Sequence, residues 1–282
     1  MNLTPLPRVM VEPLVRAALL EDLGRAGDLT TDAIVPADAT ATMALAARQP
    51  GVIAGLDVAA LAFELIDPRA EVTVVHPEGA AISAGNVLAT VRGPARALLM
   101  AERTALNFLC HLSGIATRTA AIVEGVRGHK AKIVCTRKTT PGLRALEKYA
   151  VRAGGGVNHR FGLDDAMLIK DNHIAIAGDI RTAIERARTA AGHMVKIEVE
   201  VDTLEQLDVA LAAGVDAVLL DNMSVEQLTH AVAVVGGRAI TEASGRITAQ
   251  TAPAIASTGV DLISVGWITH SAPILDIGLD CR

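Results

Sequence analysis

The sequence predicts an α/β protein whose C-terminal part forms an incomplete (β/α) barrel. From about residue 132 onward, short apolar runs alternate with amphipathic helical stretches, and repeated strand–helix units indicate a parallel sheet. The units are roughly 20 to 30 residues long, which suits such a barrel, but a complete eight-unit barrel takes about 250 residues and fewer than about 170 remain here. An open, doubly wound sheet is the competing architecture.

The predicted elements of this part alternate along the chain. Strands are expected at residues 132–136, 166–170, 195–201, 217–221, 239–244 and 262–266. Helices are expected at residues 179–191, 204–213, 225–235 and 248–257. Ser224 is an expected N-cap, and a glycine follows each of the four helix ends, at positions 192, 214, 236 and 259.

The first part of the chain has a less regular pattern. A short helix is expected at residues 12–23, ended by Gly24, and strands are expected at residues 40–48, 72–75 and 87–91. A long apolar helix is expected at residues 95–113, where Ser113-Gly114 breaks or bends it.

Composition excludes several classes of function. Hydrophobic residues make up 51% of the 282-residue chain, aromatic residues only 2%, and the net charge is −5. Few stacking side chains and no basic excess argue against a nucleic-acid partner. The cysteines, Cys110, Cys135 and Cys281, match no metal spacing and suit a reducing compartment. With no signal peptide and no apolar run of membrane-spanning length expected, we predict a cytoplasmic protein without a membrane partner.

Polar residues follow almost every predicted strand of the barrel. They are Thr136-Arg137-Lys138, Lys170-Asp171-Asn172, Glu198 and Glu200, Asp221-Asn222, Glu242-Ala243-Ser244-Gly245 and Ser264-Val265-Gly266. Active sites of barrels lie at the carboxyl ends of the strands. One polar residue there is ordinary for a loop, whereas six strands with the same feature predict one convergent pocket rather than a solvated rim.

The predicted pocket combines many cations with two acids. The cations are Arg137, Lys138, Lys170, His159 and Arg160. Fixed cations in an acidic protein indicate a small substrate with several negative charges, and arginine grips carboxylates and phosphates with paired hydrogen bonds. The acids Glu200 and Asp221 suit either Mg²⁺ or a positive charge that develops during a reaction.

Two further features point to anion binding. Ser244-Gly245 and Ser264-Val265-Gly266 follow the last two strands, where barrels often hold phosphate; each alone reads as an ordinary turn. Arg103 stands in a helix that is apolar on most faces, and a buried charge needs a partner. It forms either a structural ion pair or a contact with a substrate carboxylate.

With these residues in view, the chain resembles the quinolinate phosphoribosyltransferase family over nearly its whole length. The matching stretches are EDL (21–23), GDLTT (27–31), ERTALN (102–107), TRKTTPG (136–142), GGG (154–156), NHR (158–160), LIKDNH (168–173), EVEV (198–201), LLDNM (219–223), SVG (264–266) and THS (269–271). Arg246, after Ser244-Gly245, is a departure, because a smaller or neutral residue is expected there.

The resemblance implies a fold, an assembly and a reaction. It implies an N-terminal α/β sandwich at residues 1–115, an incomplete α/β-barrel catalytic domain at residues 116–282 with the extreme C-terminus packing back on the sandwich, and a homodimer or a higher oligomer. Arg103 would reach the partner subunit's site. The implied reaction joins quinolinate to phosphoribosyl pyrophosphate, giving nicotinate mononucleotide, pyrophosphate and carbon dioxide in NAD biosynthesis.

The resemblance also implies roles for residues. Catalytic roles fall on Lys138, Lys170, Glu200 and Asp221, and Glu200 and Asp221 would face the ribose and Mg²⁺, the latter directly or through water. Quinolinate and pyrophosphate would be bound by Arg103, Thr136, Arg137, Lys138, His159, Arg160 and Lys170. The 5′-phosphate would be bound by Ser244, Gly245, Arg246, Ser264, Val265 and Gly266. No role for His173 or His270, and no proton donor, can be derived from the sequence.

Several alternatives remain open from the residues. The nearest is a related phosphoribosyltransferase for another heterocyclic acid, including the molybdate-operon homologue of the family. A Schiff-base aldolase with Lys170 as nucleophile is a second alternative. A biotinyl-type carrier lacks an attachment lysine between Ala70 and Ala95, and a ligand sensor on a decayed scaffold does not explain the full set of cations and acids.

Overall fold

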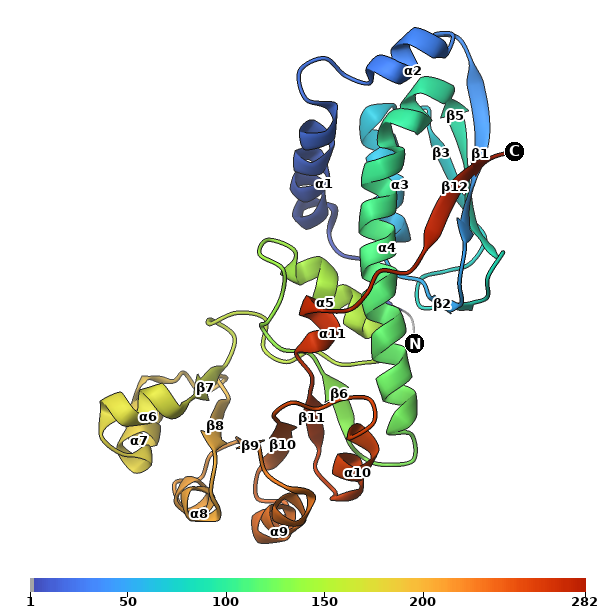
Figure 1. Cartoon of the computed structure of the whole chain (residues 1–282). Coiled ribbons are helices and arrows are strands. Elements are labelled where there is room, and N and C mark those ends of the chain that lie inside the picture. The colour runs from blue at the N-terminus through green and yellow to red at the C-terminus, as the bar shows by residue number, and fades with distance from the viewer. Residues whose placement is uncertain (1–2) are drawn as a thin grey trace. The chain divides into compact units, whose positions relative to one another are not determined.

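The computed structural model describes residues 3–282, which divide by their internal contacts into two compact units. The first unit contains the chain up to Ala120, together with Thr139–Gly155 and Ile268–Arg282. The second unit contains Ala121–Lys138 and Gly156–Trp267. Figure 1 shows the course of the chain through the elements of each unit.

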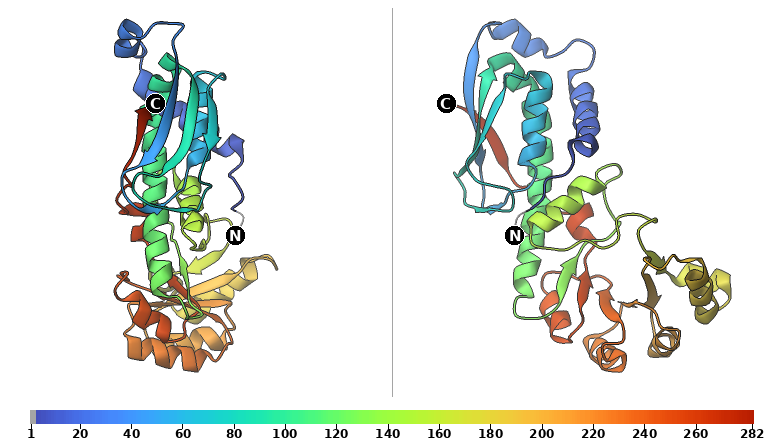
Figure 2. Two further views of the ribbon diagram at one scale, coloured as in Figure 1. Left: turned by 90° about the vertical axis from the view of Figure 1, so that its right-hand side faces the viewer. Right: turned by 180° about the vertical axis from the view of Figure 1, so that it is seen from behind.

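The first unit is an α/β sandwich built on an antiparallel sheet. The strand order is β12 (Ile277–Cys281), β1 (Thr40–Ala47), β5 (Val87–Pro94) and β3 (Glu71–Val74), beside a small ladder of β2 (Gly51–Val52) and β4 (Ala81–Ile82). Helices α1 (Arg8–Leu23), α3 (Leu56–Ile66) and α4 (Ala95–Gly125) lie to one side of the larger sheet (Figures 1 and 2). The predicted sandwich is therefore confirmed.

The C-terminal segment supplies an edge strand to this sheet. Strand β12 pairs antiparallel with β1, with Leu279 opposite Leu45 and Cys281 opposite Met43. A C-terminal strand and a strand from the N-terminal part of the chain are thus neighbours in one sheet.

Helix α4 continues well past the predicted break at Ser113-Gly114. Gly114 lies inside the helix, and a Cβ built on it would stand 2.2 Å from the carbonyl oxygen of Pro273 and 2.9 Å from Cα of Ile274. The prediction was wrong because this glycine allows close approach of a neighbouring backbone and does not end the helix.

The second unit contains the predicted barrel in incomplete form. Six parallel strands follow the order β6 (Lys132–Val134), β11 (Leu262–Ser264), β10 (Ile240–Ser244), β9 (Ala217–Asp221), β8 (Ile197–Val201) and β7 (Met167–Ile169). Helices α6 (Asp171–Ala177), α7 (Ile180–Ala190), α8 (Leu204–Ala212), α9 (Val225–Val235) and α10 (Ala252–Ser257) follow one outer side of the curved sheet (Figures 1 and 2). A doubly wound sheet would carry helices on both faces, so that alternative is wrong.

Local signals explain most element boundaries. The Ser224 hydroxyl caps α9 by accepting from Gln227, and Gly236 ends this helix with a φ of 54°. The helix predicted at residues 248–257 begins only at Ala252, because Thr248 and Thr251 bond to each other in a turn. Five helices had no predicted counterpart: α3 and α6, and also α2 (Leu29–Ile34), α5 (Arg144–Ala153) and α11 (Trp267–His270).

Two glycines of α4 provide a matched test of this packing. We expect Gly114→Ala to lower the free energy of unfolding by about 1–3 kcal/mol, because the new methyl group must displace backbone atoms. Gly125→Ala should be neutral or stabilising by up to about 1 kcal/mol, because its nearest neighbour lies 3.8 Å from the built Cβ. Denaturant unfolding checks both, and equal losses would contradict this explanation.

Candidate active site

A cavity lies at the carboxyl edge of the parallel sheet in the second unit. Its volume is about 300 Å³. Its lining residues come from the ends of the strands and from the segments that follow β6 and precede β7: Thr136, Arg137, Lys138, His159, Arg160, Leu168, Lys170, Leu219, Glu242, Ser244 and Ser264. Since all strands of the sheet are parallel, their carboxyl ends meet at this edge.

Two guanidinium groups face the same small cavity. Burial and the positive charge of Arg137 lower the pKa of Arg160. The Nη1 of Arg160 donates to the carbonyl oxygen of Ala166 at 2.9 Å, while its Nε is buried without a partner among the described residues. Two neighbouring cations with few fixed acceptors favour a bound anion, and guanidinium groups bind carboxylates in paired fashion.

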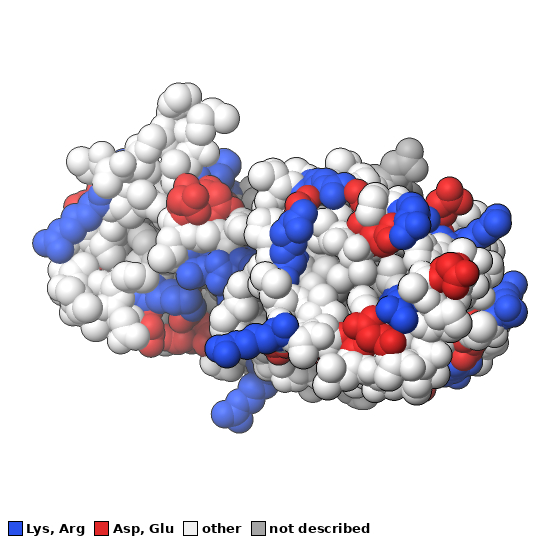
Figure 3. Space-filling view, turned by 90° about the horizontal axis from the view of Figure 1, so that it is seen from above, with Lys and Arg blue, Asp and Glu red and all other residues white. Residues whose placement is uncertain are grey.

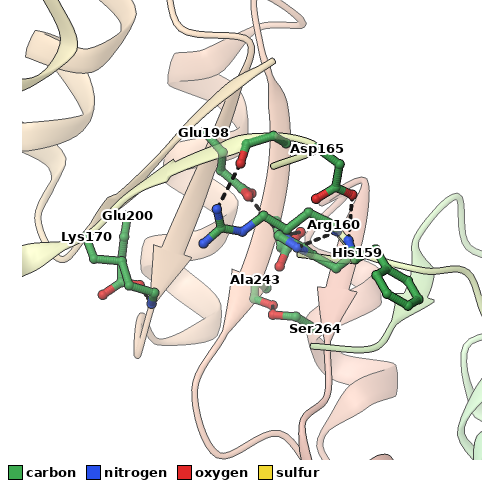
Figure 4. Close-up of polar contacts among 11 residues, drawn as sticks. His159, Arg160, Asp165, Lys170, Glu198, Glu200, Ala243 and Ser264 are labelled. Atoms are coloured by element: carbon green, nitrogen blue, oxygen red, sulfur yellow. Dashed lines mark hydrogen bonds and ion pairs between the residues drawn. The ribbon is translucent and has the colours of Figure 1, made fainter. Parts of the chain in front are cut away.

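The loop that carries Arg160 is fixed by its own carboxylate. Asp165 accepts hydrogen bonds from the backbone N–H groups of Phe161 at 2.6 Å and Gly162 at 3.0 Å. These bonds close a tight loop beside β7, shown in Figure 4. The arginine is therefore presented by a preorganised segment.

An imidazole and two carboxylates form a buried cluster on the floor of the cavity. His159 Nε2 lies 2.9 Å from Oε2 of Glu198 and 3.6 Å from Oε2 of Glu242 (Figure 4 labels the first two residues). The ligand atoms of these three residues all lie within 4.8 Å of one another, a spacing that a metal ion could bridge. Burial and the neighbouring charge of Glu198 raise the pKa of Glu242 to about 7.

Lys170 and Glu200 form an ion pair at the mouth of the cavity, on neighbouring strand ends (Figure 4). Lys170 precedes α6, and its backbone N–H donates to Nδ1 of His173 at 2.9 Å. His173 therefore has a structural role, because it caps the helix that follows the lysine.

Asp221 stands beside Glu200 at the ends of strands β9 and β8. Its Oδ2 accepts from the side-chain amide of Asn222 at 2.5 Å, and Asn222 has a φ of 54°. Glu200 and Asp221 together offer two carboxylates, which are fewer ligands than a metal site made of protein side chains alone requires. Such a donor set fits Mg²⁺, which keeps water ligands and binds substrate phosphates.

The loop after β10 combines close packing with an unusual backbone. Gly245 has a φ of 107°, and a Cβ built on it would stand 2.3 Å from Oδ1 of Asn222. Arg246 follows with a φ of 43°, the left-handed region that disfavours arginine, and its side chain is exposed. Ser264 Oγ donates to the carbonyl oxygen of Ala243, and the N–H of Val265 donates to that of Val134.

The structure brings together many of the residues predicted for the site. Eight line the cavity: Thr136, Arg137, Lys138, His159, Arg160, Lys170, Ser244 and Ser264. Six stand at the same strand edge outside its lining: Glu200, Asp221, Gly245, Arg246, Val265 and Gly266. Arg103 lies on α4 in the first unit and is exposed, so the premise that it is a buried charge was wrong.

Sequence reasoning missed the acids of the cavity floor and its apolar walls. Glu198 and Glu242 were included among the polar residues at the strand ends but were given no role in the site, and the lining residues Leu168 and Leu219 were not selected. A carboxylate in the middle of a buried parallel strand is itself unusual, and this signal could have identified Glu242.

Charges of both signs lie close together at two other places that the structure describes. The face in Figure 3 shows Lys and Arg interspersed with Asp and Glu. At the amino edge of the parallel sheet, Lys130 pairs with Asp261 at 3.0 Å and Lys196 with Asp216 at 2.5 Å. In residues 3–282, no helix combines the length and apolarity that crossing a bilayer requires.

Comparison with known proteins is consistent with this geometry. The model of the quinolinate phosphoribosyl transferase C-terminal domain matches residues 115–280, and that of the N-terminal domain matches residues 28–113. The chain belongs to the quinolinate phosphoribosyl transferase family. Together, the two matches span both the sandwich and the parallel sheet.

Individual family members match nearly the full chain. A nicotinate-nucleotide pyrophosphorylase [carboxylating] of Mycobacterium leprae is 52% identical, over 94% of this chain and 95% of its own. A probable enzyme of the same name from Bacillus subtilis is 46% identical, over 96% and 93%. The crystal structure of NadC from Streptococcus pyogenes superposes with a TM-score of 0.95 at 43% identity, covering 99% of both chains.

Two neighbouring substitutions test the backbone of the loop after β10. Arg246→Gly should raise the free energy of unfolding by about 1 kcal/mol, because glycine adopts positive φ without the strain of a side chain. Gly245→Ala should lower it by about 1–3 kcal/mol, because the new methyl group collides with Asn222. Both are measured by denaturant unfolding, and a loss of stability in Arg246→Gly would show that the arginine side chain holds the loop.

Proposed function

We propose that the protein catalyses phosphoribosyl transfer from phosphoribosyl pyrophosphate to quinolinate, with decarboxylation. The products are nicotinate mononucleotide, pyrophosphate and carbon dioxide, and the role is in NAD biosynthesis. The observation that carries this proposal is the cavity that Arg137 and Arg160 line together with His159 and Lys170. Arginine binds carboxylates through paired hydrogen bonds, which suits a dicarboxylate, and the family relatives named above are carboxylating pyrophosphorylases.

The first chemical step is displacement at the anomeric carbon of the ribose. The pyridine nitrogen of quinolinate attacks this carbon as the bond to pyrophosphate breaks, and positive charge develops on the sugar. Glu200 and Asp221 stand at the strand edge where they would face that charge. One carboxylate about 4 Å away contributes at most roughly 4 kcal/mol at an effective dielectric constant near 20.

The second step uses the charge created in the first. Once the ring nitrogen carries the ribose, it withdraws electrons from the adjacent carbon, so the 2-carboxylate leaves as carbon dioxide. The electron pair stays on that carbon and takes up a proton. Arg137, Arg160 and His159 would orient the two carboxylates, while Lys138 and Lys170 would hold the pyrophosphate.

A magnesium ion completes the proposal as cofactor. Glu200 and Asp221 would hold it, directly or through water, and the ion would offset the charge on the departing pyrophosphate. The Ser244–Arg246 and Ser264–Gly266 loops would bind the sugar phosphate, and Thr136 would contribute to binding quinolinate and pyrophosphate.

We also propose a cytoplasmic homodimer with shared active sites. Arg103 is an exposed cation on α4, and no function within the first unit accounts for it. In this assembly it binds a quinolinate carboxylate in the site of the partner subunit.

The reaction is tested by following both small products. Purified protein is incubated with quinolinate, phosphoribosyl pyrophosphate and Mg²⁺, and carbon dioxide and pyrophosphate are measured together. Equal release that depends on all three additions supports the proposal. Release of neither product from folded protein would contradict it.

The second candidate is transfer to another heterocyclic acid, and nicotinate is the discriminating substrate. Nicotinate has one carboxylate and cannot be decarboxylated in this reaction. The two guanidinium groups in one cavity favour the dicarboxylate. Pyrophosphate release with nicotinate but not with quinolinate would favour the alternative.

Two lysine–carboxylate pairs of the second unit provide matched variants. Lys170→Ala and Glu200→Ala, at the carboxyl edge, should each lower kcat by about 100-fold or more while the protein remains folded. Lys196→Ala removes the pair with Asp216 at the opposite edge and should leave turnover within about twofold. Steady-state kinetics and circular dichroism check these outcomes; unaltered turnover in both carboxyl-edge variants would refute their assignments.

The shared site predicts complementation between inactive subunits. Arg103→Ala and Lys170→Ala should each be nearly inactive alone. After mixing and subunit exchange, random pairing gives hybrid dimers with one intact site, so activity should return to about a quarter of that of the wild type. If each subunit holds its complete site, the mixture stays as inactive as its components.

A further inference from the structure

Glu242 is a buried carboxyl group whose contact with His159, at 3.6 Å, is longer than a hydrogen bond. It lies in the middle of β10, its exposed fraction is 1%, and it lines the cavity. No hydrogen bond from a described residue reaches Oε1 or Oε2 of this side chain, and both atoms are buried. A carboxylate in such a place is strongly destabilised, so it either takes up a proton or binds a cation.

The tautomer of His159 is fixed by its two contacts. The backbone N–H of Arg160 donates to Nδ1 at 2.8 Å, and a backbone N–H can only donate, so Nδ1 carries a lone pair. Nε2 therefore carries the ring proton, which it donates to Glu198 at 2.9 Å. The imidazole is neutral in this arrangement, and its distance of 3.6 Å from Glu242 is too long for a good hydrogen bond.

The groups around Glu242 come from every neighbouring element. Glu198 on β8 is a like charge, and together with burial it raises the pKa of Glu242. His159, the Ser264 hydroxyl on β11 and the charge of Lys170 after β7 act in the opposite direction. Leu219 on β9 stands opposite Glu242 in register and offers no polar atom, while Arg137 and Arg160 line the same cavity.

We propose that Glu242 is held as a neutral carboxylic acid and that its proton keeps His159 neutral and the Arg160 backbone in place for the acid substrate. This is a positioning role, and it rests on the proposed function. If the proton passed from Glu242 to His159 instead, the net charge of the cluster would not change, but the imidazole would become an imidazolium. An imidazolium Nδ1–H would then face the Arg160 N–H, so the loop must shift.

A metal ion is the alternative occupant of the cluster, and the hydrogen bonds argue against it. Binding through Nε2 requires a lone pair there, which moves the ring proton to Nδ1. The Arg160 N–H occupies that position. A proton on Glu242 leaves the cluster with the single negative charge of Glu198 and changes no contact of His159.

The proposal predicts a pH-dependent affinity for quinolinate, measured by calorimetry without the ribosyl donor. Deprotonation adds negative charge to a site for a dianion, so the wild-type Kd should rise by up to about tenfold per pH unit above pH 7. Glu242→Gln keeps the shape and cannot ionise, so its Kd should be nearly constant. In Glu198→Gln the rise should begin at lower pH, because loss of the like charge lowers the pKa of Glu242.

Infrared difference spectroscopy tests the proton itself, without substrate. The difference spectrum of the wild type minus Glu242→Gln should show the carbonyl stretch of a protonated carboxyl group at pH 6. This band should fade as the pH rises and should be unaffected by EDTA. If the variant does not fold, the band is followed by pH titration and deuterium exchange in the wild type alone. Absence of the band, or one tightly bound metal ion per chain, would overturn the proposal.

The thermal midpoint gives an independent readout. The folded-state pKa of Glu242 lies above its ordinary value of 4.5, so its contribution to stability is present below pH 4.5 and is lost as the pH rises through about 7. Glu242→Gln should therefore become more stable relative to the wild type between pH 5 and 8; an unchanged difference would overturn the proposal. Failure to bind quinolinate at any pH, with the infrared band present, would reject the proposed function instead.

Discussion

The repulsion between Arg137 and Arg160 is the constraint on which the rest of the site depends. Both guanidinium groups line one cavity of about 300 Å³, and burial together with the charge of Arg137 lowers the pKa of Arg160. A folded chain keeps such an arrangement only where other elements hold it, here the Asp165 loop and the Ala166 carbonyl. The arrangement becomes favourable when an anion with more than one charge arrives. The charges of the cavity are thus better balanced when an anionic substrate is bound than in the free protein.

The parallel sheet makes this concentration of charge possible. Because all six strands run in one direction, side chains far apart in sequence meet at one edge, while the other edge carries the ion pairs Lys130–Asp261 and Lys196–Asp216. The acids are layered beneath the cations: Glu198 and Glu242 are buried in the strands, and Glu200 and Asp221 stand at their ends. With this arrangement, the cations of one small site bind anions, while its carboxylates face a positive charge that develops on the substrate.

The sequence was sufficient for the barrel strands and for the residues at their ends, because alternation and strand-end polarity are local signals. The sequence was insufficient where packing against a distant segment of backbone determines the local structure. Gly114 resembles a helix break until the approach of Pro273 is known, and β12 is an edge strand only because β1 accepts it. Arg103 was assumed to be buried from an apolar neighbourhood, yet it is exposed. Glu242 was grouped with the polar residues at the strand ends without a role of its own, since its isolation depends on its neighbours in three strands.

The most direct test of this account is to compare the binding of quinolinate and nicotinate by calorimetry at increasing salt, without the ribosyl donor. If paired guanidinium groups define the site, the dicarboxylate binds at least about tenfold more tightly, and Arg160→Gln removes most of the difference. Equal affinities for the two acids, unchanged in that variant, would show that the like-charge pair does not select the substrate.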